Sequence, residues 1–192
     1  MTKRSKGNHG DPEKDWRDAP RAFLKTETGI PGLDQILNGG LPRGRCSLVC
    51  GGPGTGKTVL AMDFIMRGIL RHHEPGVFVS FEDRPSEFES NAGSLGYNAR
   101  ALKARKRLAF DYIHIESNDF KRAGQYDLEG IFIRLDRAIS AVKAKRVVLD
   151  SIDALFAGFS DRGLLRSELR RLFGWLKDRG VTTLITAERG SG

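Results

Sequence analysis

The sequence lacks any long apolar run. No stretch of its 192 residues approaches the ~18 consecutive apolar residues of a membrane-spanning helix, so we expect no membrane partner. Residues 1–22 contain basic side chains but no apolar core, which does not fit a secretory signal and indicates a disordered polar tail. Without an export signal, the expected location is cytoplasmic.

Cysteine is also scarce. Cys46 and Cys50 are the two cysteines of the chain and lie on one expected strand. At about 3.3 Å per residue they would be roughly 13 Å apart, too far for a disulfide. No histidine stands at ligand spacing, so they also make a poor zinc site. We interpret both as small core residues.

The rest of the composition is typical of one globular domain, with 39% hydrophobic and 29% charged residues. The formal net charge of +8 indicates an anionic partner. Both a nucleotide and a nucleic acid fit that description, and charge alone does not choose between them.

Strand-like and helix-like segments alternate along the chain. Apolar β-rich runs cover 46–50, 77–82, 110–116, 146–151 and 182–188. Helical spacing of apolar residues covers 58–73, 127–145 and 161–180. This alternation predicts an α/β domain over residues 23–192, with a mostly parallel sheet and helices on both faces. Because only four residues follow the fifth run, we expect a sheet truncated after its fifth core strand.

The segment GGPGTGKT, residues 51–58, fits the pattern G-x-x-x-x-G-K-[ST] between a strand and a helix. Gly51, Gly54 and Gly56 allow backbone conformations in which successive N–H groups point inward at an anion. Lys57 would neutralise terminal phosphates, and the Thr58 hydroxyl would take one Mg²⁺ position. A glycine-rich turn with a chance Lys-Thr is the alternative. The pattern and its context predict a site for a nucleoside triphosphate.

Acidic residues follow two of the expected strands. Asp150 ends the run RVVLD and is the candidate for the second metal-side group, with a helix N-cap as the alternative role. Asp153 is the weaker candidate. Glu82 and Asp83 follow another run, where one carboxylate could orient the attacking water. Alternation along a strand would let only one of them point inward, and ordinary exposed turn acids are the alternative.

Six motifs stand in one order along the chain: TGIPGLDQILNGGLPRG, GGPGTGKT, PGVFVSFED, NAGSLGY, VVLDSIDALF and TTLITAE. Together they resemble the KaiC family of RecA-like P-loop ATPases, over residues 26 to about 190, and most closely the N-terminal of the two KaiC repeats. The resemblance implies a RecA-type parallel sheet, a hexameric ring with Mg-ATP between neighbouring subunits, and circadian or signalling regulation. It also implies a KaiB-like regulatory protein as a partner.

The resemblance also implies roles for single residues. The residues that match the family's phosphate-binding loop are Gly54, Thr55, Gly56, Lys57, Thr58 and Val59. Thr58 and Asp150 match the magnesium side, Glu82 the catalytic carboxylate, and Ser94 a nucleotide contact near the base.

The chain departs from the family at two places. Asp83 stands where the family usually has a second glutamate, which shortens the side chain by about one C–C bond, and ~1 Å of misplacement can lower a rate 10²-fold. The basic residues that reach a neighbour's ATP, and the second repeat that carries autokinase activity, have no counterpart here. Kinase activity is therefore not carried over.

Three functions remain open at this point. The first is an ATPase module that binds ATP and hydrolyses it slowly when assembled with its neighbours. The second is a DNA-binding ATPase of the recombinase type, supported by the net charge and the row Arg162, Arg166 and Arg170. The third is a nucleotide-sensing fragment that does not hydrolyse ATP. In a RecA-type order, the truncation would leave the strand before the glycine loop at or near an exposed edge.

Overall fold

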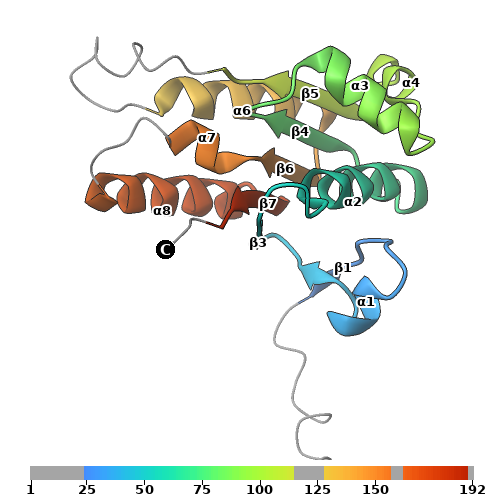
Figure 1. The fold of residues 1–192 in the computed structure, drawn as a ribbon, viewed down its shortest axis with the longest axis horizontal. Helices are drawn as coiled ribbons and strands as arrows, with labels where there is room; N and C mark the ends of the chain where they lie inside the picture. The colour runs from blue at the N-terminus through green and yellow to red at the C-terminus, as the bar shows by residue number, and fades with distance from the viewer. Residues whose placement is uncertain (1–23, 115–127, 157–161, 190–192) are drawn as a thin grey trace, which may run out of the picture.

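The computed structural model describes residues 24–114, 128–156 and 162–189. Strands and helices alternate through most of this part of the chain (Figure 1). In chain order the elements are β1 (Lys25–Thr26), α1 (Leu33–Ile36), β2 (Leu41–Pro42), β3 (Cys46–Gly51), α2 (Lys57–Arg71), β4 (Gly76–Ser80), α3 (Pro85–Ser94), α4 (Ala99–Ala104), β5 (Leu108–Tyr112), α6 (Glu129–Val142), β6 (Arg146–Asp150), α7 (Ile152–Phe156), α8 (Arg162–Asp178) and β7 (Thr182–Glu188). No helix in these ranges is both long and apolar enough to cross a membrane.

The five longer strands form one parallel sheet in the order β3-β7-β6-β4-β5. This confirms the predicted α/β class. Among the described residues, β3 pairs only with β7, so the strand before the glycine loop lies at the edge of the sheet, as expected. The strands run in one direction, so the loops that follow them gather at one edge, the carboxyl edge. The turns that precede them gather at the opposite, amino edge.

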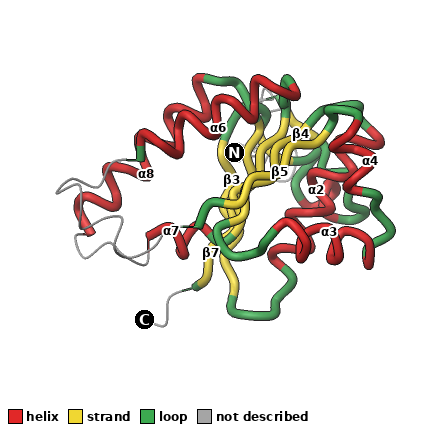
Figure 2. The backbone as a smooth tube through the Cα atoms, turned by 90° about the horizontal axis from the view of Figure 1, so that it is seen from above, coloured by secondary structure: helices red, strands yellow, loops and turns green. Residues whose placement is uncertain are grey.

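Helices cover both faces of the sheet. Figure 2 shows α6, α7 and α8 on one face and α2, α3 and α4 on the other. Side chains alternate accordingly along β4, where Val77 and Val79 belong to the core under α6 and α8, and Phe78 to the core under α2. β4 and β6 are buried along their whole length, which explains why they appear in the sequence as continuous apolar runs.

Some predicted boundaries are wrong. The run predicted over 77–82 ends as a strand at Ser80, because the Ser80 hydroxyl accepts hydrogen bonds from the backbone N–H groups of Glu82 and Asp83 and turns the chain. The run predicted over 110–116 is a strand only to Tyr112, and residues 115–127 lie outside the described ranges. Helices α3 and α4 were not predicted, because each buries only two residues and gives a weak apolar period.

The two cysteines have different environments. Both are free, as predicted. Cys46 is half-buried and packs on the core under α8. Cys50 is exposed, so its interpretation as a core residue is wrong: β3 is an edge strand, and Cys50 lies on the same face of it as Leu48, which is also exposed.

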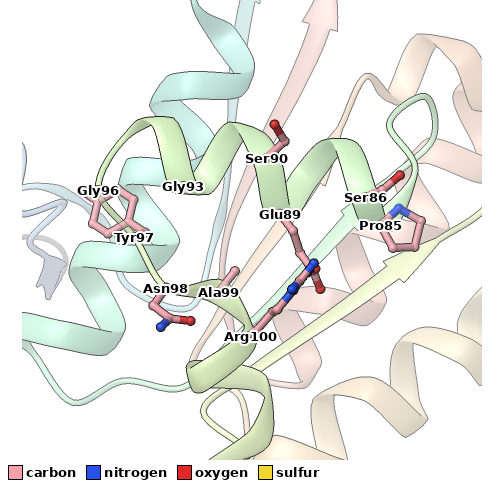
Figure 3. Close-up of a pocket in the computed structure, with 10 residues that line it drawn as sticks. All are labelled: Pro85, Ser86, Glu89, Ser90, Gly93, Gly96, Tyr97, Asn98, Ala99 and Arg100. Carbon is pink, nitrogen blue, oxygen red and sulfur yellow. Dashed lines mark hydrogen bonds and ion pairs between the residues drawn. The ribbon is translucent and has the colours of Figure 1, made fainter.

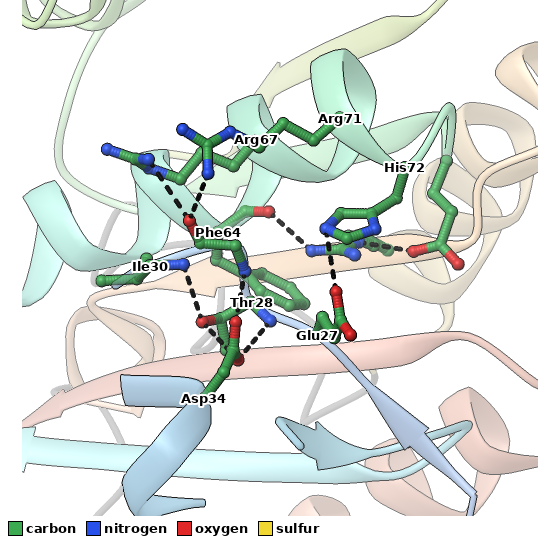
Figure 4. Close-up of polar contacts among 11 residues, drawn as sticks. Glu27, Thr28, Ile30, Asp34, Phe64, Arg67, Arg71 and His72 are labelled. Atoms are coloured by element: carbon green, nitrogen blue, oxygen red, sulfur yellow. Dashed lines mark hydrogen bonds and ion pairs between the residues drawn. The ribbon is translucent and has the colours of Figure 1, made fainter. Parts of the chain in front are cut away.

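A short segment before the sheet, residues 24–42, is held together by Asp34 and bound to α2 by two arginines of that helix (Figure 4). The Asp34 carboxylate accepts hydrogen bonds from the Thr28 N–H (2.7 Å), the Thr28 hydroxyl (2.8 Å) and the Gly29 N–H (2.9 Å). Arg67 and Arg71 of α2 both donate to the Gly29 carbonyl at 3.2 Å. Burial alone would raise the pKa of Asp34, but the hydrogen bonds from Thr28 and Gly29 hold it below the ordinary value.

A basic side chain is buried inside the domain. Arg146, at the start of β6, is 1% exposed. Its guanidinium donates to Glu74 at 2.7 Å and to the Phe64 carbonyl at 3.0 Å, so the buried charge is paired. Gly68 of α2 makes room for it, since a Cβ there would lie 2.4 Å from the Arg146 side chain.

Candidate functional site at the carboxyl edge

The glycine loop lies at the carboxyl end of β3 and leads into the first turn of α2. Gly54 and Gly56 have φ angles of +72° and +85°, a region that residues with a Cβ rarely adopt. A Cβ at Gly51 would lie 2.6 Å from the Thr55 hydroxyl. The loop therefore needs these glycines, and the helix that follows adds the positive end of its dipole. This arrangement suits an anion bound by backbone N–H groups.

Lys57 and Thr55 are held by the loop itself. The Lys57 ammonium donates to the carbonyls of Gly51 (3.0 Å) and Gly52 (2.8 Å), and the Thr55 hydroxyl donates to Gly52 at 2.9 Å. To neutralise a phosphate, the ammonium would exchange these carbonyls for phosphate oxygens. Val59, in the first turn of α2, is 48% exposed.

Asp150 reaches the first turn of α2. Its carboxylate accepts from the Thr58 hydroxyl at 3.3 Å, although 92 residues separate the two in sequence. Asp150 is 2% exposed, and burial raises its pKa, while the hydrogen bonds from Thr186 and Thr58 lower it. Because its carboxylate bonds these two side chains, the structure does not support the alternative role as a helix N-cap.

A hydroxyl and a carboxylate side by side are oxygen ligands of the kind that Mg²⁺ prefers. The described residues contain no group of three or more His, Cys, Asp or Glu that could hold a metal. That is consistent with magnesium, which keeps several waters and is usually bound by one or two carboxylates together with phosphate oxygens. Thr58 and Asp150 thus fit a magnesium ion that bridges to a bound phosphate.

Thr186 is a site residue that the sequence analysis missed. It is fully buried on β7, its hydroxyl donates to Asp150 at 2.6 Å, and it accepts from the Ser151 N–H at 2.8 Å. Since the N–H occupies one lone pair, the hydroxyl proton is directed at the carboxylate. Ser151 has φ +58°, in the left-handed region. The sequence places Thr186 near the carboxyl end of an expected strand, but only the sheet order shows that this strand lies next to β6.

The two acids after β4 lie in a loop. The argument that strand alternation turns only one of them inward is therefore wrong, since the strand ends at Ser80. Glu82 is exposed and Asp83 is half-buried. Burial, followed by the charges of Glu87 and Glu82, raises the pKa of Asp83. The charges of both Asp83 and Glu82 also raise the pKa of Asp150, so all three acids share one electrostatic environment.

Other candidates lie apart from this group. Asp153 accepts from the N–H of Glu188 at 2.8 Å and so supports the end of β7. Glu188 itself is exposed and pairs in register with Gly51, a position that the sequence analysis did not consider. In the row on α8, Arg166 and Arg170 are exposed, and the side chain of Arg162 lies outside the described part.

Ser94 is the last residue of α3 and is exposed, and its hydroxyl donates to the Asn91 carbonyl of the same helix at 2.7 Å. An open groove of about 680 Å³ lies nearby, between α3 and α4 (Figure 3). Its lining consists of Pro85, Ser86, Glu89, Ser90, Gly93, Gly96, Tyr97, Asn98, Ala99 and Arg100. None of residues 51–58 lines it, so the case for a nucleotide rests on the glycine loop.

Comparison with known proteins agrees with this geometry. The family model described as "ATPase: KaiC" matches residues 26–192. A circadian clock protein KaiC2 from Synechocystis sp. is 48% identical over 169 residues, which are 88% of this chain and 30% of the relative. A circadian clock oscillator protein KaiC from Parathermosynechococcus lividus is 42% identical over 169 residues, 88% of this chain and 31% of the relative.

The chain thus spans about a third of the length of the curated relatives it matches. The match includes the glycine loop, the strand that ends in Asp150 and the strand that carries Thr186. The sheet order and the site both fit a RecA-like nucleotide-binding domain, and the chain belongs to the KaiC ATPase family.

Proposed function

We propose that this chain binds Mg-ATP at the carboxyl edge of its sheet and hydrolyses it slowly, in an assembly whose neighbouring subunits complete the site. The observation that carries the proposal is the contact between Thr58 and Asp150 at 3.3 Å. It joins the helix after the glycine loop to a buried strand end, where a phosphate-bound magnesium needs its protein ligands.

The residues around the loop then have separate tasks. Backbone N–H groups of residues 54–58 bind phosphate oxygens, and Lys57 neutralises the terminal phosphates. Thr58 and Asp150 hold the magnesium, which when bound draws charge from the β- and γ-phosphate oxygens. Thr186 keeps the Asp150 carboxylate turned toward Thr58.

Glu82 is the residue we propose to orient the attacking water. Its side chain is exposed and free to reach a γ-phosphate, whereas the Asp83 carboxylate accepts from Asn91 at 3.5 Å and is half-buried. Asp83 would act mainly through its negative charge beside Asp150. If Glu82 is the catalytic carboxylate, the shorter side chain of Asp83 does not change its position.

The assembly and its partners are also part of the proposal. By family resemblance we propose a hexameric ring with ATP between subunits, a contact of Ser94 with the nucleotide, a KaiB-like regulatory partner and a cytoplasmic location. The names of the relatives support a role in circadian timing for those proteins, and we extend this role to the present chain.

The test is phosphate release from Mg-ATP over a range of protein concentrations, with Lys57→Ala as the control. Specific activity should rise with concentration and fall at least about 100-fold in the variant, the scale seen when one transition-state contact is removed. Binding of a fluorescent ATP analogue is measured in parallel. If the wild-type protein binds the analogue but releases no phosphate at any concentration, the function that fits is a nucleotide sensor that does not hydrolyse ATP. Full activity in Lys57→Ala would overturn the proposal.

A further inference from the structure

The amino edge of the sheet carries a group of cations that the proposed function does not use. They stand in the turns before β5 and β6, and together with His73 in the turn before β4 we call them the amino-edge cluster: Arg105, Lys106, Arg107, Lys143 and Lys145. Backbone hydrogen bonds hold these turns side by side. The Lys145 N–H donates to the Pro75 carbonyl (2.8 Å), and the Gly76 N–H donates to the Arg107 carbonyl (3.0 Å). The three strands are neighbours, so the cluster spans two strand spacings, ~10 Å.

The charge of this cluster is not neutralised within the described ranges. Arg105, Lys106, Lys143 and Lys145 are exposed, and none of them takes part in an ion pair there. The acid in these turns, Glu74, already pairs with the buried Arg146 at 2.7 Å. An anionic ligand would therefore meet several free cations at once.

Three members of the cluster have an unusual backbone conformation. His73, Lys106 and Lys143 have φ angles of +56°, +52° and +55°, in the left-handed region that helices usually reserve for glycine after their last turn. The turns at Lys143 and Lys106 are closed in the same way, by the Ala144 N–H on the Ile139 carbonyl (2.9 Å) and the Arg107 N–H on the Leu102 carbonyl (3.0 Å), and the turn at His73 by the Glu74 N–H on the Gly68 carbonyl (3.1 Å). A side chain at such a position costs free energy relative to glycine.

Two helices elsewhere in the described ranges end with glycine at this position, whereas Asn38 with φ +50° follows α1. Gly96 after α3 and Gly180 after α8 have φ angles of +84° and +67°. Gly180 also lies at the amino edge, where the segment before β3 packs over it: a Cβ at Gly44 would lie 3.6 Å from the Gly180 carbonyl. A Cβ at Gly96 or at Gly180 would meet no atom within 4 Å, so lack of space does not explain the choice of glycine there.

Stabilisation of helix ends explains the cluster only in part. A cation in the last turn favours the negative end of a helix dipole. That accounts for one cation on each helix, but Arg107 and Lys145 lie outside the helices, and the left-handed positions are the least favourable places for a side chain.

We propose that the amino-edge cluster binds the phosphate backbone of a nucleic acid, independently of base sequence. A protein partner is the weaker candidate, because protein interfaces have apolar or aromatic centres, and none of the exposed large hydrophobic residues lies in these three turns. Clustered cations without stacking side chains match phosphate contacts, which carry no sequence information.

The test measures binding of the full chain to a fluorescein-labelled duplex, and to one of its single strands, as a function of salt, both with and without saturating Mg-ATP. With four exposed cations engaged, log K should fall with log salt with a slope of about −3 to −4. In the double variant Lys106→Gly/Lys143→Gly, affinity should fall about 10-fold and the slope should weaken by about 2. Its melting temperature should be unchanged or higher, since glycine suits both positions.

Two further variants keep the test decisive. Lys106→Asn/Lys143→Asn removes the same charges with a residue that tolerates the left-handed region, and should give the same loss of binding. Arg166→Gln/Arg170→Gln removes two charges from α8 and should leave the slope unchanged. The proposal is overturned if the α8 variant is the one that loses affinity, or if polyglutamate competes as well as nucleic acid. It is also overturned if Mg-ATP displaces the probe, or if the glycine variant melts at a lower temperature while its binding is unchanged.

Discussion

The two edges of the sheet use the left-handed backbone region in opposite ways. At the carboxyl edge it is occupied by Gly54 and Gly56, where a missing side chain exposes N–H groups to an anion. At the amino edge it is occupied by Lys106 and Lys143, which hold charged side chains out to solvent. The carboxyl edge is built to bind through its backbone, and the amino edge presents side chains.

The edges also differ in the sign of their charge. Glu82, Asp83 and Asp150 share the carboxyl edge with Lys57, and in the proposed function a magnesium ion would offset their negative charge when a triphosphate binds. The amino-edge cluster has no comparable acid left unpaired among the described residues. One fold can therefore hold a metal-bound nucleotide at one edge and a bare polyanion at the other.

The largest expected effect at the carboxyl edge comes from Thr186→Val. The variant leaves the Ser151 N–H without a partner in a buried place and removes the shorter of the two hydrogen bonds to Asp150 Oδ1, which should lower the free energy of unfolding by about 1–3 kcal/mol. In the wild type, the hydrogen bond from Thr186 opposes the burial that raises the pKa of Asp150. Without this bond, that pKa should rise further.

Magnesium needs the ionised carboxylate. As pH is lowered, Mg-ATP binding by Thr186→Val should therefore begin to weaken at a higher pH than binding by the wild type. Titration calorimetry over a pH series checks this, together with urea unfolding. Thr186→Ser keeps the hydroxyl and should restore the pH dependence. A wild-type pH profile in the valine variant would show that Thr186 has no positioning role.

A pair of glycine substitutions tests the role of the backbone. Gly56→Ala forces a Cβ into φ +85°, which should cost about 1–2 kcal/mol and weaken ATP binding about 10-fold, although the position has open space around it. Gly174→Ala, inside α8 and also in open space, should instead stabilise the protein by about 0.5–1 kcal/mol. Thermal unfolding and nucleotide titration of both variants decide; equal effects would mean that conformation at Gly56 does not matter.

The smallest effect concerns the segment that covers part of the amino edge. Asp34→Asn removes the charge that fastens Thr28 and Gly29, and should cost about 1 kcal/mol at neutral pH. The pKa of Asp34 is lowered in the folded state, so its contribution is present above the unfolded value of about 3.9 and is lost as pH falls through the folded value.

The stability difference between wild type and Asp34→Asn should therefore shrink as pH falls below about 4. Urea unfolding at a series of pH values measures it. A difference that stays constant into acid would show that the charge of Asp34 is not what holds the segment.

The sequence was sufficient for the features that depend on local pattern. The alternation of runs predicted the parallel sheet, and residues 51–58 predicted the glycine loop. The edge position of β3 followed from the family's strand order. Thr186 was missed because its role depends on which strand lies beside β6, and periodicity does not show strand order. The amino-edge cluster was missed for the same reason, since its turns are distant in sequence and meet only in the folded sheet.

The central claim is that Thr58 and Asp150 join magnesium to a bound nucleotide. The most direct measurement is the affinity for a fluorescent ATP analogue with and without Mg²⁺, for the wild type, Asp150→Asn and the matched control Asp153→Asn. Magnesium should strengthen binding to the wild type and to Asp153→Asn, and should have almost no effect on Asp150→Asn. Magnesium-independent binding by the wild type, or an unchanged magnesium effect in Asp150→Asn, would contradict the account.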